Sequence, residues 1–102
     1  MSKAEQNAQF ASVLREAAEE IGWLRHAFPV PSHFSCNAVL RAAADHGLDV
    51  DECVTAYSRV YFSRRRLRIE DFSSLGIRSA EANNHRETAL ALAAAVYETG
   101  GL

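Results

Sequence analysis

Cysteine and proline are both scarce in this chain, which contains two of each among its 102 residues. Cys36 and Cys53 are too few to form a disulfide scaffold. Each cysteine lies near the start of an expected helix, so an antiparallel helix pair would hold them at opposite ends, and we expect both thiols to be reduced. Pro29 and Pro31 lie together, so proline interrupts helical structure in one place only.

The chain also lacks a strong excess of one charge and a long apolar run. Its formal net charge is -2, whereas domains whose whole surface binds nucleic acid are usually strongly basic. The longest apolar run, Ala89 to Tyr97, is shorter than the roughly 20 residues that span a bilayer. The first residues, MSKAEQNAQF, contain no apolar signal region. We therefore expect a cytoplasmic protein with no membrane partner.

Helical periodicity is the main pattern that the chain does contain. Apolar residues recur at steps of three and four from Phe10 to Phe28, with Arg15 and several glutamates on the opposite side. This spacing predicts an amphipathic helix, which the two prolines end at Phe28. A last helix is expected from Ser79 to Gly100, because serine favours helix starts and glycine favours helix ends.

Residues 35–66 predict a helical hairpin that organises the chain. Gly47 supplies a left-handed stop between its two helices. A short helical turn is expected over residues 67–77. The predicted fold is therefore all-α: one domain over residues 1–102, a small bundle of four main helices plus a short helical turn. The candidate caps of the hairpin helices are Ser32 or Ser35 and Asp49 or Asp51.

The last expected helix is apolar on every side from Ala89 to Tyr97. A surface helix of a globular domain has only one apolar side, so both sides of this helix need a cover. Either the helix runs through the middle of the domain, or its second side is an interface between two copies. For the second case we predict a homodimer through four residues: Ala89, Leu92, Ala93 and Val96.

A cluster of arginines and aromatic residues follows the middle of the chain. Such clusters are typical of protein interaction hot spots, although arginines also stabilise helix ends. We predict that this cluster binds a protein partner with an acidic surface. The predicted residues are Tyr57, Tyr61, Arg64, Arg65, Arg66 and Arg68.

A helix-turn-helix motif can be placed on the sequence in two ways. With Gly47 at the turn, the spacing is acceptable, but the second helix begins with the acidic residues Asp49, Asp51 and Glu52, which repel phosphates. With Gly76 at the turn, the following residues have the chemistry that contacts bases and phosphates. The predicted DNA-binding residues are Arg78, Asn83, Asn84 and Arg86.

No pattern in the sequence predicts catalysis. His33, Cys36, His46 and Cys53 do not have the spacing of a zinc module, so we expect neither a metal nor another cofactor. No nucleophile motif or phosphate-binding loop is present. We predict a small non-enzymatic regulatory or adaptor protein that binds another protein. The alternative is a small helix-turn-helix-like DNA-binding transcriptional regulator.

Overall fold

The computed structural model describes residues 2–24, 33–62 and 86–101, and these residues form four helices. No strand occurs in these three ranges. The all-α prediction is therefore confirmed, as is the number of main helices. The helical turn predicted over residues 67–77 lies outside the described residues. The helices are α1 (Lys3–Leu24), α2 (His33–Asp45), α3 (Val50–Phe62) and α5 (Arg86–Glu98).

Helix α1 begins seven residues before the apolar pattern at Phe10 that predicted it. Its start is fixed by Ser2, whose Oγ accepts a hydrogen bond from the backbone N–H of Glu5 at 3.2 Å. This is the usual way in which serine caps a helix, since it satisfies one of the free N–H groups of the first turn. The predicted continuation to Phe28 lies outside the described residues.

The hairpin between α2 and α3 turns at Gly47, as predicted. Gly47 has a φ of 66°, a conformation that glycine adopts at low cost. The N–H of Gly47 donates to the Ala44 carbonyl at 3.0 Å, and the N–H of Leu48 donates to the Ala43 carbonyl at 2.9 Å. These two bonds form a Schellman motif, which satisfies carbonyls that a helix end would otherwise leave free.

The caps of the hairpin are now assigned where the structure describes them. Asp49 caps α3, because its Oδ1 accepts the N–H of Glu52 at 3.1 Å, and Asp51 lies inside the helix. Ser35 does not cap α2, because it lies within the helix and is buried. The other predicted cap, Ser32, lies outside the described residues.

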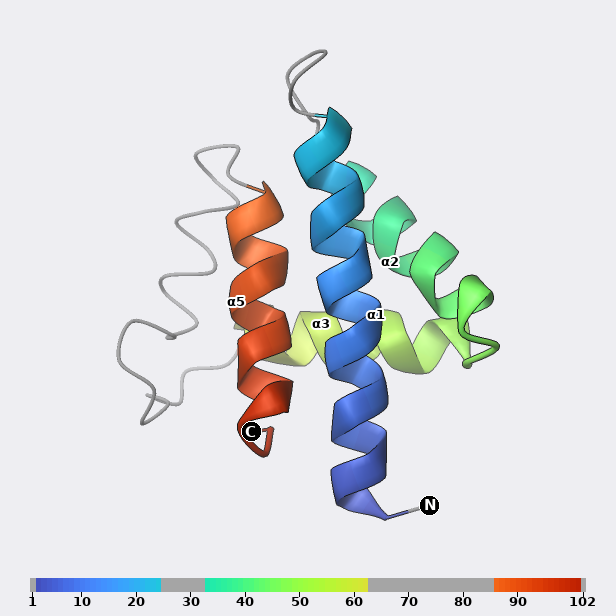
Figure 1. The fold of residues 1–102 in the computed structure, drawn as a ribbon, viewed down its shortest axis with the longest axis vertical. Helices are drawn as coiled ribbons and strands as arrows, with labels where there is room; N and C mark the ends of the chain where they lie inside the picture. Colours follow the sequence, from blue (N-terminus) through green and yellow to red (C-terminus); the bar gives the residue numbers. More distant parts are fainter. Residues whose placement is uncertain (1, 25–32, 63–85, 102) are drawn as a thin grey trace.

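Helices α1 and α5 lie side by side and run in opposite directions, and α3 crosses behind them (Figure 1). Helix α2 packs against α1 and leads through Gly47 into α3. Glu87 packs against Gly22 at one end of the α1–α5 pair, and Asn7 contacts Gly100 at the other. The core consists mainly of small and medium-sized residues from all four helices, including Val13, Leu14, Ile21, Val39, Val60, Leu90 and Val96.

Helix α5 ends at the two glycines that were predicted to stop it. Gly100 and Gly101 have φ values of 109° and 80°, and the N–H of Gly101 donates to the Val96 carbonyl at 2.9 Å. The side-chain amide of Asn7 on α1 donates to the Gly100 carbonyl at 2.9 Å. This bond attaches the end of α5 to the first turns of α1.

Among the described helices, none combines the length and the apolar character needed to cross a bilayer.

Candidate interaction surface

The two cysteines considered for chemistry have different surroundings in the structure. Both cysteines are free; Cys36 is exposed and Cys53 is buried. Burial raises the pKa of the Cys53 thiol, and the negative charges of Glu52 and Asp49 raise it further. A thiol in this environment is a poor nucleophile, because the thiolate is the reactive form. Within the described ranges, no group of three or more His, Cys, Asp or Glu residues is placed to hold a metal ion.

The predicted arginine and aromatic surface is mostly outside the described residues. Tyr57 is half-buried on α3 and packs against the core. The side chain of Tyr61 is not among those described, and neither are Arg64, Arg65, Arg66 and Arg68. This surface therefore stays a prediction.

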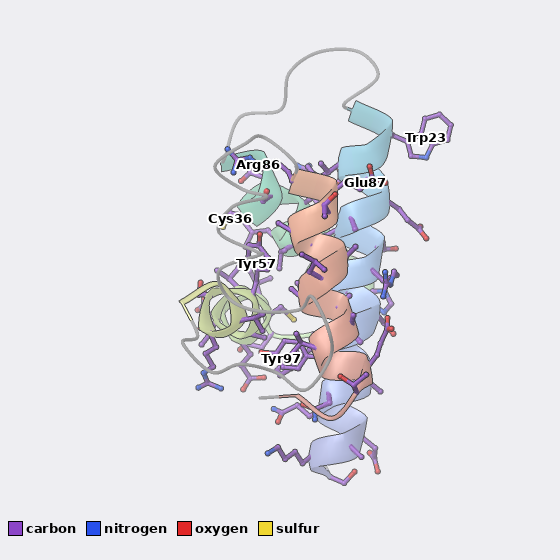
Figure 2. All side chains as sticks on the ribbon, turned by 90° about the vertical axis from the view of Figure 1, so that its left-hand side faces the viewer. Trp23, Cys36, Tyr57, Arg86, Glu87 and Tyr97 are labelled. Atoms are coloured by element: carbon purple, nitrogen blue, oxygen red, sulfur yellow. The ribbon has the colours of Figure 1, made fainter. Side chains whose placement is uncertain are left out.

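Most of the predicted DNA-binding residues also lie outside the described residues. Arg78, Asn83 and Asn84 lie outside the described residues. Arg86 is half-buried in the first turn of α5, on the side toward α2 (Figure 2). In the other helix-turn-helix placement, Asp51 and Glu52 are exposed on the first turn of α3, where their charges oppose the approach of phosphates.

The predicted homodimer interface on α5 needs correction. Ala89, Ala93 and Val96 are all 0% exposed within a single chain, and Leu92 is partly buried against the same core. Helix α5 is covered by α1, α3 and α2, so its apolar character comes from its position inside the bundle. Ala89, Ala93 and Val96 are therefore not available to a second copy, whereas Leu92 keeps part of its surface exposed.

Trp23 on the last turn of α1 is the exposed large hydrophobic residue of the described chain. Its side chain is 81% exposed, and Figure 2 shows it projecting from α1 on the side away from α5. Tryptophan has a large apolar area and is enriched at protein interfaces. The residue is therefore the strongest indicator of a binding surface in this structure.

The helical turns below Trp23 carry three glutamates. Glu20 accepts a hydrogen bond from Arg41 of α2 at 2.6 Å, and Glu16 Oε2 lies 3.4 Å from His46 Nε2. Glu19 is exposed and has no ion pair with the described residues. Residues three and four positions apart are neighbours on a helix, so Glu19 and Glu20 lie directly beside the indole of Trp23.

An open groove lies between the first half of α1 and the last turn of α5. It has a volume of about 430 Å³ and is open to solvent. Its α1 wall includes three alanines together with Asn7 and Ser12, and Tyr97 lines its α5 side. Arg15 closes one end by donating from Nε and Nη2 to Glu98 Oε1, at 3.1 and 2.7 Å. The three alanines are Ala4, Ala8 and Ala11.

The side of α1 opposite its core residues, which we call the outer face of α1, carries Trp23 near one end and some of the groove-lining residues near the other. At 100° per residue, its members from Ala8 to Trp23 fall within an arc of about 100°. Most of the core residues of α1 are on the opposite side. The outer face consists of Ala4, Ala8, Ser12, Arg15, Glu16, Glu19 and Trp23.

Trp23 was not among the residues predicted from the sequence, although a signal was present. Trp23 follows Ile21 by two positions, which places it about 200° around the helix from the apolar side that contains Ile21. A tryptophan on the polar side of an amphipathic helix is a candidate for binding. The sequence prediction instead placed the binding surface at the arginine cluster.

The described helices are acidic as a whole. They carry ten acidic and five basic side chains, a formal charge of -5, against -2 for the complete chain. The remaining residues therefore contain six of the eleven basic side chains and only three of the thirteen acidic ones. A surface of this sign favours protein partners over phosphate backbones.

Comparison with protein-family models, with curated proteins and with solved structures found no match to this chain.

Proposed function

We propose that this protein is a non-enzymatic regulatory or adaptor domain that associates with a protein partner through the outer face of α1. The observation that carries this proposal is the 81% exposure of Trp23. The other large apolar side chains that the structure describes are buried or half-buried, so Trp23 is the exception among them.

An exposed tryptophan can contribute a large binding free energy when a partner covers it. Burying a tryptophan removes about 150–250 Å² from water, and tryptophan is among the residues most enriched at interaction hot spots, where truncation costs about 2–4 kcal/mol. The glutamates on the preceding turns of α1 supply polar side chains around it. This combination of an apolar anchor with a polar surround is typical of transient protein interfaces.

The test compares the capture of partners by tagged full-length variants, expressed in the cells that produce the protein. Trp23→Ala removes the anchor, and Thr55→Ala removes an exposed side chain on α3 as the matched control. We expect partners retained by the wild type and by Thr55→Ala to bind Trp23→Ala at least about 30-fold more weakly, as the loss of about 2 kcal/mol implies. Equal capture by all three proteins would overturn the proposal.

The same experiment separates the two earlier hypotheses from this one. If the partner is held by the arginine cluster, the triple change Arg64→Ala, Arg65→Ala and Arg66→Ala will abolish capture and Trp23→Ala will not. If the ligand is DNA, capture will depend on nuclease-sensitive material. It will then also fall steeply between about 50 and 200 mM salt.

A further inference from the structure

We draw no further inference here: the strongest candidate, the open groove between the first half of α1 and the last turn of α5, carries nothing, because Asn7 and Arg15 in its lining already bond within the chain and nothing in the part of the chain that the structure describes shows what covers its alanine wall.

Discussion

Tyr97 is a single residue that connects three helices. Its hydroxyl on α5 donates to the Ala56 carbonyl of α3 at 2.6 Å, and its ring packs edge to face with Phe10 of α1, with centroids 5.4 Å apart. Burial raises the pKa of Tyr97 to about 12, and Arg59 acts weakly in the opposite direction. The ordinary value is near 10, so the folded protein favours the neutral phenol.

This pKa predicts how stability depends on pH. Because the folded-state pKa lies above the unfolded one, the contribution of neutral Tyr97 is complete below pH 10 and is lost as the pH rises toward 12. Between pH 9 and 11, we expect the wild type to lose about 1 kcal/mol relative to Tyr97→Phe, which has no phenol to ionise. Urea unfolding at each pH measures the difference. Parallel curves for the two proteins would contradict this assignment.

At the scale of helices, two glycines restrict substitution for different reasons, one through its backbone conformation and the other through the space for a side chain. Gly47 has a φ of 66° and no atom within 4 Å of an added Cβ, so only its backbone conformation restricts substitution. Gly22 lies in the regular part of α1, where an added Cβ would be 2.8 Å from Glu87 Oε1. The Glu87 carboxylate is the end of a flexible side chain and can move.

Alanine should therefore have different effects at these two positions. Gly47→Ala should lower the free energy of unfolding by about 1 kcal/mol, the cost of a left-handed conformation. Gly22→Ala should range from no change to a gain of about 1 kcal/mol, because the higher helix propensity of alanine offsets the displaced Glu87. Chemical denaturation measures both.

A matched background separates the two contributions at Gly22. In Glu87→Ala the contact with the carboxylate is absent, so Gly22→Ala should show the full propensity gain. If Gly22→Ala is more destabilising than Gly47→Ala in the wild-type background, the contact at Gly22 is tighter than the structure indicates.

The elements also show which parts of the fold the sequence could predict. Local signals were sufficient for the α2–α3 hairpin, since Gly47 and Asp49 act through bonds within a few residues. The start of α1 was missed because its first turns carry no apolar pattern, although Ser2 and Glu5 have the spacing of a helix cap. Periodicity identifies an apolar helix but does not identify its neighbours. It therefore did not decide whether α5 lies in the core or at an interface between two copies.

The candidate site was less predictable than the fold. The proposed surface depends on the exposure of Trp23, and the groove between α1 and α5 exists only because these two helices pack together. No local pattern specifies such a packing. Trp23 itself was readable from its position on the polar side of α1.

At the scale of the whole molecule, Asn7 joins two parts of the chain that are 93 residues apart. It is 8% exposed, and its amide nitrogen would lie 3.1 Å from a Cβ added at Gly101. Asn7→Ala should lower the free energy of unfolding by about 0.5–1.5 kcal/mol, because it removes the partly buried hydrogen bond to the Gly100 carbonyl. Gln6→Ala, an exposed neighbour, is the control and should change stability by less than about 0.5 kcal/mol.

Hydrogen exchange gives a second measure of the same contact. The amide of Gly101, which donates to Val96, should exchange faster in Asn7→Ala than in Gln6→Ala, because the end of α5 is released from α1. Equal protection in the two variants would show that the turn at Gly100 and Gly101 is stable without Asn7.

The pairing of α1 with α5 has a consequence for biosynthesis. Helix α1 leaves the ribosome first, while α5, the element with which it packs most extensively, is translated about 60 residues later. At about 5–20 residues per second, the nascent chain spends several seconds with the apolar side of α1 lacking its main cover. During that interval Val13, Leu14 and Ile21 are available to chaperones, and co-translational folding of the core must wait for the last helix.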